Sequence, residues 1–118
     1  SKMIEKYPTF KFVRGDTQGF VVKATFIDGT PLQQIDIKDI LITFRQFPYK
    51  SSNIIFQKGI NGVKVDNDGL HFIIEPKDTE NLDYGEYAFD IQVTTTNDIV
   101  KTSFAHFILT DETTINEV

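Results

Sequence analysis

The sequence from Leu70 to Val93 reads LHFIIEPKDTENLDYGEYAFDIQV. Apolar and polar residues alternate at both ends of this stretch, which predicts two β-strands, because successive side chains of a strand point to opposite faces. Between the strands, Pro76 and the acidic residues after it predict a single helical turn, since proline suits the first position of a helix. The second strand then opens with the pattern Leu-x-x-Gly-x-Tyr, which ends at Tyr87. This pattern is typical of a tyrosine corner, in which the hydroxyl binds the backbone of the connection that carries the chain between two sheets.

Shorter alternating segments lie on both sides of this stretch. Strands are expected at residues 9–13, 20–26, 40–44, 54–57, 63–65 and 100–109, and hairpin-type turns at residues 61–62 and 68–69. Many short strands with frequent turns predict an all-β fold, an immunoglobulin-like antiparallel β-sandwich with a tyrosine corner and one short helical turn. The sandwich is expected to span residues 9–110, after an N-terminal extension of residues 1–8 and before a polar C-terminal tail of residues 111–118.

The composition excludes several classes of function. The 118 residues carry a net charge of −5 and form no cluster of lysine and arginine, so nucleic acid is not expected as a partner. No apolar run has the length of a membrane span and no signal peptide is seen, so no membrane partner is expected either. The chain has no cysteine and no tryptophan but eleven phenylalanines. A core of phenylalanine and β-branched residues without disulfides is therefore expected.

Several patterns resemble functional motifs, but a structural interpretation fits each of them better. Arg14-Gly15-Asp16 is a tripeptide that some ligands present to integrins, yet here it lies between two apolar strands, where it is expected to form a turn. Residues 66–69 (DNDG) resemble the start of a calcium loop, but His71 and Lys77 occupy the positions of its glycine and its bidentate glutamate. A hairpin turn is expected there, with a weak surface calcium site left open.

No catalytic or metal-binding pattern is evident either. His71 and His106 show no zinc-ligand spacing and are expected to be solvated or at a sheet edge. Neither a Gly-x-Ser-x-Gly motif nor a phosphate-binding glycine loop occurs, and the carboxylates lie in turns and on polar strand faces. We therefore expect a protein that is not an enzyme and that has no catalytic residue, no cofactor and no metal.

The residues singled out for a role are structural or lie at a candidate interface. The expected structural residues tie the crossover, bend it, cap its helical turn or fix the first corner; they are Tyr87, Gly85, Leu82, Asp78, Thr79, Arg14 and Asp16. The last expected strand is apolar on both faces, which is usual for strands that are covered on both faces. Its extra apolar residues, with others near residue 45, form a candidate interface of Leu41, Phe47, Tyr49, Phe104 and Ile108. A loop folded over this face is an equally good explanation.

Three groups of residues, in this order, resemble a known family. They are residues 12–17 (FVRGDT), residues 28–32 (DGTPL) and the pattern PxDTxxLxxGxYxxDIQ from Pro76 to Gln92. They are similar to the immunoglobulin-like N-terminal domain of the baseplate upper protein of phages and prophages of Gram-positive bacteria, over residues 10–110. Residues 47–52 and 58–60 depart from that family.

The resemblance implies a structural part of the phage tail tip that attaches host-recognition proteins to the particle, with no catalytic residues. The expected function is that of an assembly domain of a tail or baseplate protein, made in the bacterial cytoplasm and located in the virion. Its partners would be other tail or baseplate proteins, or a second copy. An alternative is a carbohydrate-binding or adhesin-type β-sandwich of a bacterial surface protein, for which Phe47, Tyr49 and Tyr84 are the candidate aromatic platforms.

Overall fold

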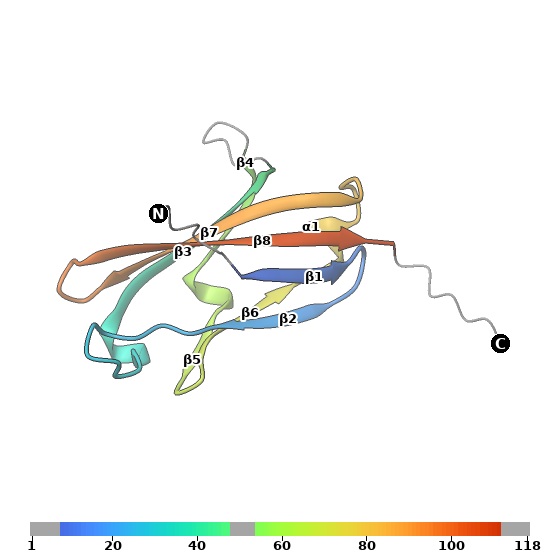
Figure 1. Ribbon diagram of the computed structural model, residues 1–118. Coiled ribbons are helices and arrows are strands. Elements are labelled where there is room, and N and C mark those ends of the chain that lie inside the picture. The colour runs from blue at the N-terminus through green and yellow to red at the C-terminus, as the bar shows by residue number, and fades with distance from the viewer. Residues whose placement is uncertain (1–7, 48–53, 112–118) are drawn as a thin grey trace, which may run out of the picture.

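The structure is a computed structural model that describes residues 8–47 and 54–111. Figure 1 shows its strands and helices along the chain. The described strands are β1 Thr9–Val13, β2 Gln18–Val22, β3 Ile37–Gln46, β4 Ile54–Gly59, β5 Lys64–Asp66, β6 Gly69–Ile74, β7 Gly85–Thr95 and β8 Val100–Thr110. The described helices are three short pieces, η1 Gln34–Asp36, η2 Ile60–Gly62 and α1 Pro76–Thr79. Most of the expected extension and tail lies outside the described residues.

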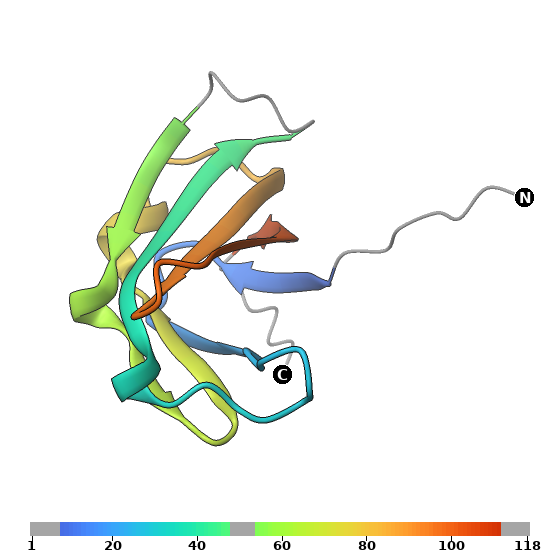
Figure 2. The same ribbon diagram turned by 90° about the vertical axis from the view of Figure 1, so that its left-hand side faces the viewer.

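Two sheets pack face to face, as Figure 2 shows. One sheet has five strands in the order β1-β8-β7-β3-β4, and the other has three in the order β2-β6-β5. The predicted all-β sandwich is thus confirmed. Among the described strands, β1 and β8 form the one parallel pair, with Thr9 opposite His106 and Val13 opposite Thr110, and the other pairs are antiparallel. The parallel pair arises because β1 and β8 come from opposite ends of the chain and need no tight turn between them.

The core between the sheets is built largely from phenylalanine rings, as the composition predicted. Phe44, Phe89 and Phe107 of the five-stranded sheet have at most 1% of their surface exposed. Phe72 of the three-stranded sheet stacks on Phe20, with 5.0 Å between the ring centroids. Phe20 in turn meets Phe89 edge to face at 5.3 Å, which joins the two sheets. Such aromatic pairs contribute about 0.5–1.5 kcal/mol each beyond the area that they bury.

The predicted tyrosine corner is present where the chain crosses from β6 to β7. The Tyr87 hydroxyl donates a hydrogen bond of 2.6 Å to the carbonyl oxygen of Asp83, four residues upstream. The ring is 7% exposed and stacks on Phe107 at 5.0 Å between centroids. Gly85 has a φ of +134°, a backbone conformation that glycine adopts freely, so it provides the predicted bend. Burial raises the pKa of the Tyr87 hydroxyl above its ordinary value, so the protonated donor form is favoured.

The same crossing is bound to the first corner of the chain, the turn between β1 and β2. Arg14 donates a 3.3 Å hydrogen bond to the Leu82 carbonyl, and its guanidinium lies 4.1 Å from the centre of the Tyr84 ring. The backbone amide of Gly15 donates to Oγ1 of Thr79 at 2.9 Å. These contacts join residues more than 60 positions apart in the sequence. They make Arg14 a tie between two loops, in addition to its expected place in the first corner.

Two of the expected structural roles were wrong. Thr79 was expected to cap the helical turn, but it is buried and accepts the Gly15 amide instead. The capping contact comes from Asp78, which accepts a 2.8 Å hydrogen bond from the Glu75 amide and also pairs with Lys58 at 2.8 Å. Leu82 has its expected structural place, packed partly buried against the core.

Asp16 was expected to fix the first corner, and its side chain does not do so. The described part of the chain shows no hydrogen bond to its carboxylate, and its backbone amide donates to the Val13 carbonyl at 3.2 Å. The side chain of Gln18 binds the corner instead. Its oxygen accepts the Val13 amide at 2.6 Å and its nitrogen donates to the Val13 carbonyl at 2.9 Å. The amide side chain thereby pairs with one backbone residue as a neighbouring strand would.

Two elements differ from their expected extents. The second strand was expected to reach Phe26, but β2 ends at Val22, opposite Leu70, because its partner β6 begins at the hairpin there. Residues 61–62 were expected to form a hairpin turn and instead belong to η2. That short helix carries the chain from β4 in one sheet to β5 in the other, and strands of different sheets cannot be joined as a hairpin.

Candidate functional site

The predicted interface residues that the structure describes lie on the outer face of the five-stranded sheet, the side away from the core. Ala105, Phe107 and Leu109 of β8 are buried in the core, so Phe104 and Ile108 between them point outward. Leu41 of β3 lies on the same outer face, because its neighbours Ile40 and Ile42 are core residues. Phe104 and Phe47 are 38% and 39% exposed, and Leu41 and Ile108 are partly buried. Tyr49 lies outside the described residues.

Polar groups occupy the middle of this outer face and are buried there. In the register of β8, β7 and β3, one row is Phe104, Asp90 and Thr43, and the next is His106, Ala88 and Arg45. Asp90 is 7% exposed and pairs with Arg45, with 3.4 Å between Nε and Oδ2. Thr43 is 3% exposed and accepts a 3.0 Å hydrogen bond from Gln57 of β4. A buried charge is stable only when it is paired, and the Arg45–Asp90 pair meets this need while linking the adjacent strands β3 and β7.

The apolar residues flank this polar centre. Phe47, just after β3, meets the His106 ring edge to face at 4.9 Å between centroids. The alternation along β8 was the signal that revealed Phe104 and Ile108, and the structure brings them onto one face with Leu41 and Phe47. Sequence reasoning missed the Arg45–Asp90 pair, because nothing local marks two residues 45 positions apart as neighbours. The result is an amphipathic face with a charged pair at its centre and apolar groups around it.

A larger hollow lies between the two sheets, at the end where the β7–β8 hairpin projects. It has a volume of about 560 Å³. Leu70, Ile91 and Val93 form its apolar base and are 1%, 3% and 7% exposed. One wall is formed by residues 22–28, the end of β2 and the loop after it, and the other by residues 99, 101 and 103 of the hairpin. We call this hollow the intersheet cleft. Its volume falls in the range of pockets that hold small-molecule ligands, about 300–1,000 Å³.

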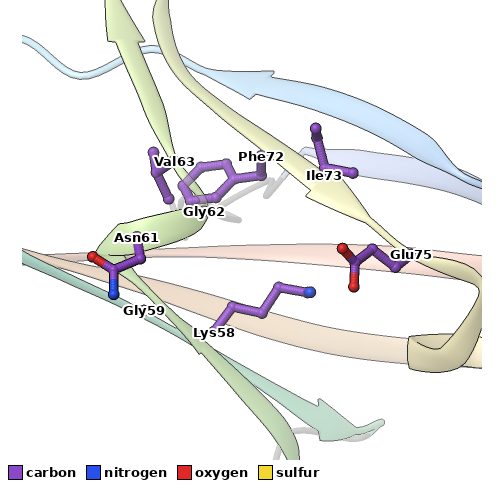
Figure 3. A pocket seen from close by; sticks show the side chains of 8 residues that line it. All are labelled: Lys58, Gly59, Asn61, Gly62, Val63, Phe72, Ile73 and Glu75. Atoms are coloured by element: carbon purple, nitrogen blue, oxygen red, sulfur yellow. The ribbon is translucent and has the colours of Figure 1, made fainter.

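A smaller pocket of about 340 Å³ lies at the opposite side of the sandwich, beside η2. Figure 3 shows the Lys58 side chain extending from β4 toward Glu75, with Phe72 and Val63 along the other side of the pocket and Asn61 at one end. The Lys58 ammonium is bound by Asp78 at 2.8 Å. This ion pair links β4 to the helical turn α1, so Lys58 has a structural role in the pocket.

The hairpin between β5 and β6 brings together three potential metal ligands, Asp66, Asp68 and His71, whose ligand atoms lie within 4.8 Å of one another. Asp66 Oδ1 accepts the Asp68 amide at 2.9 Å and lies 2.8 Å from His71 Nε2. The hydrogen bond to His71 lowers the pKa of Asp66. The expected hairpin turn is therefore present, and these contacts close it. The sequence analysis did not foresee the contact between Asp66 and His71, which the hairpin register brings about by placing His71 near a residue five positions earlier.

The remaining motifs occupy structural positions. His106 lies on β8 beside Phe47, and the Arg14-Gly15-Asp16 tripeptide forms the turn between β1 and β2, as expected.

In residues 8–47 and 54–111 no helix is long and apolar enough to cross a bilayer. That the chain is not an enzyme and needs no metal or cofactor stays a prediction.

Comparisons with known proteins bear on the fold. No family model matches this chain, and no curated protein matches it. Among solved structures, CopC from Methylosinus trichosporium OB3b is similar, with a TM-score of 0.50 and 8% sequence identity. The alignment covers 92% of this chain and 90% of CopC. At this identity the likeness concerns the fold alone, and it agrees with the β-sandwich described above.

Proposed function

We propose that this chain is a non-enzymatic assembly domain of a phage or prophage tail-baseplate protein, and that it binds another virion protein through the outer face of its five-stranded sheet. The observation that carries the proposal is the placement of Leu41, Phe47, Phe104 and Ile108 on one face, around the buried Arg45–Asp90 pair. Apolar and aromatic groups around a desolvated polar centre are typical of protein interfaces. The resemblance to baseplate upper proteins supports the phage setting.

Binding to the tail proteins encoded beside this chain tests the proposal. Each would be purified and its affinity for the immobilised chain measured by interferometry. The variant Phe104→Asp is expected to weaken binding by about 10-fold or more, which corresponds to roughly 1.4 kcal/mol. The matched control is Val21→Asp, because Val21 is 43% exposed and lies on the three-stranded sheet. This variant should bind within about 2-fold of the wild type, because the side chain of residue 21 lies on the other sheet, away from the proposed face.

Two outcomes would contradict the proposal: none of the neighbouring tail proteins binds, or Phe104→Asp binds as well as the wild type. A circular dichroism melt of each variant shows whether it is folded before its binding is interpreted.

The carbohydrate-binding alternative depends on aromatic rings that are free to stack on a sugar. Tyr84 is 44% exposed, but the Arg14 guanidinium covers one face of its ring. Phe47 is occupied on one side by His106. Binding on a glycan array that is lost in Tyr84→Ala would favour this alternative over the assembly domain.

A further inference from the structure

The inner row of side chains on β8 changes character where it reaches the intersheet cleft. Ala105, Phe107 and Leu109 of this row are buried in the core. The next two members of the row are Ser103 and Lys101, and both line the cleft. A hydroxyl and a cation therefore stand in line with core residues. Such departures from an otherwise consistent apolar pattern are expected at functional sites.

The strand register shows what these two side chains stand beside. Ser103 lies opposite Ile91 of β7, and Lys101 lies opposite Val93. Residues directly opposite each other in an antiparallel pair share one face of the sheet. Ile91 and Val93 belong to the apolar base of the cleft. The short side chain of Ser103 leaves room above that base, and Lys101 places a cation at its side.

Each wall of the cleft is held by hydrogen bonds of its own. In the wall that follows β2, the Phe26 amide donates to the Thr30 carbonyl at 2.8 Å. In the wall formed by the β7–β8 hairpin, the Thr95 amide donates to the Ile99 carbonyl at 2.9 Å. Pockets for small ligands are usually formed before the ligand binds. These backbone contacts give the cleft that property.

The rim of the cleft is apolar, like its base. Phe26 on one wall and Ile99 on the other are 39% and 62% exposed, and Ile27 beside Phe26 is fully exposed. Exposed apolar groups that gather around a hollow are typical of ligand-binding grooves. The apolar part of an occupant would lie between this rim and the buried base.

The charged groups of the cleft favour an anion. Lys23 and Lys101 line it from the two walls and are exposed, and neither forms an ion pair with a described residue. Asp28 supplies a carboxylate to the lining, but this group accepts the amide and the hydroxyl of Thr30 at 3.0 and 2.6 Å. The charge of Asp28 is thus engaged within its own turn, whereas the two ammonium groups can bind a carboxylate from outside the chain.

We propose that the intersheet cleft binds a small amphipathic carboxylate, such as an unbranched medium-chain fatty acid. Its apolar chain would pack on Leu70, Ile91 and Val93, and its carboxylate would be held by Lys23 and Lys101. This inference goes beyond the proposed function, because the cleft lies between the sheets whereas the proposed protein interface lies on the outer face.

Calorimetric titration of the purified full chain tests the proposal. Decanoate and octanoate are compared below the concentrations at which they form micelles, with decanol and decyltrimethylammonium as matched neutral and cationic probes. Each buried methylene contributes about 0.8 kcal/mol, or roughly 4-fold, so decanoate is expected to bind about 15-fold more tightly than octanoate. The neutral and cationic probes should bind at least about 10-fold more weakly than decanoate.

Variants separate the contact with the apolar chain from the contact with the carboxylate. Ser103→Phe fills the cleft and should abolish binding of every probe, whereas Thr102→Phe places the same ring on the outer face and should change binding by less than about 2-fold. Lys101→Gln should weaken decanoate binding about 10-fold and leave decanol binding unchanged. The control Lys64→Gln, on β5 of the other sheet, should change neither.

The proposal is overturned if neither carboxylate binds, or if decanol binds as tightly as decanoate, because no anion is then recognised. Binding that persists in Ser103→Phe would place the site elsewhere on the chain and would equally refute it. A circular dichroism melt shows which variants are folded. If Ser103→Phe is not, the contrast between Lys101→Gln and Lys64→Gln decides, and equal decanoate binding by these two would refute the proposal.

Two other occupants of the cleft would be revealed by the same variants. Decanoate binding that occurs only after removal of residues 1–7 would identify that segment of this chain as the occupant. A dimer in light scattering that Ser103→Phe abolishes would identify a second copy. Either result overturns the proposal. The titrations contain no tail protein, so their outcome is independent of the Phe104→Asp test of the proposed function, and one can fail without the other.

Discussion

Replacement of Tyr87 separates the contribution of the corner hydrogen bond from that of the ring. Tyr87→Phe deletes the hydroxyl that donates to the Asp83 carbonyl at 2.6 Å. A neutral hydrogen bond contributes about 1 kcal/mol net, and the freed carbonyl belongs to an exposed residue that water can reach, so the loss should stay near that value. Tyr87→Ala also removes a ring that is 7% exposed and stacked on Phe107. Its cost should be about 3–5 kcal/mol.

These free energies convert to measurable melting temperatures. An unfolding entropy of about 2.1 cal/mol/K per residue gives roughly 0.25 kcal/mol/K for 118 residues. Tyr87→Phe should therefore lower Tm by about 4 °C and Tyr87→Ala by about 12 °C or more. Urea denaturation followed by circular dichroism measures the same free energies independently.

Tyr84→Phe is the matched control for this series. The Tyr84 hydroxyl also donates to a residue, Asp111, but at 3.3 Å and on an exposed side chain, so its loss should change Tm by less than about 2 °C. If Tyr87→Phe melted at the same temperature as Tyr84→Phe, the corner hydrogen bond would contribute nothing. If Tyr87→Ala were as stable as the wild type, the corner would have no part in holding the sheets together.

Three further perturbations have clear expected outcomes. Gly69 and Gly85 share a φ of +134°, but a Cβ on Gly69 would lie 2.3 Å from the Val22 carbonyl oxygen while one on Gly85 meets nothing within 4 Å. In urea melts Gly69→Ala should therefore cost about 4 kcal/mol or more and Gly85→Ala about 1–3; equal costs would contradict the close approach. Thr79→Val leaves a partly buried amide of the first corner without its acceptor and should cost about 1–3 kcal/mol, and a neutral result would exclude that contact. Because burial raises the pKa of Tyr87 above 10.0, the unfolded chain releases this proton first. Stability should fall as the pH rises through 10 toward the folded pKa, and less steeply in Tyr87→Phe; parallel pH profiles of the two proteins would contradict this.

The local pattern of the sequence was enough to predict the elements and the corner. Alternation identified the long strands β7 and β8, and the spacing from Leu82 to Tyr87 identified the crossing, because both depend on neighbours within a few residues. The end of β2 at Val22 could not be predicted in this way. It is set by where its partner strand β6 turns, and therefore by a register between distant segments.

The candidate site likewise has features that the local sequence pattern predicts and features that depend on distant residues. The outward direction of the Phe104 and Ile108 side chains follows from alternation along the strand, so it could be predicted from the sequence. The Arg45–Asp90 pair and the tie between Gly15 and Thr79 join residues 45 and 64 positions apart, and only the fold brings them together. The intersheet cleft is lined by residues 22–28 and by residues 99–103, segments that are far apart in the sequence, so no single segment encodes it.

The parallel pairing of β1 with β8 has a mechanical consequence. The chain enters this pair at Thr9 and leaves it at Thr110, and those points lie at opposite ends of the pair. Figure 1 shows the two strands side by side and pointing the same way. Tension applied through the two ends would load all the hydrogen bonds of the pair at once, in shear, instead of opening them one by one. We therefore expect high rupture forces in single-molecule pulling.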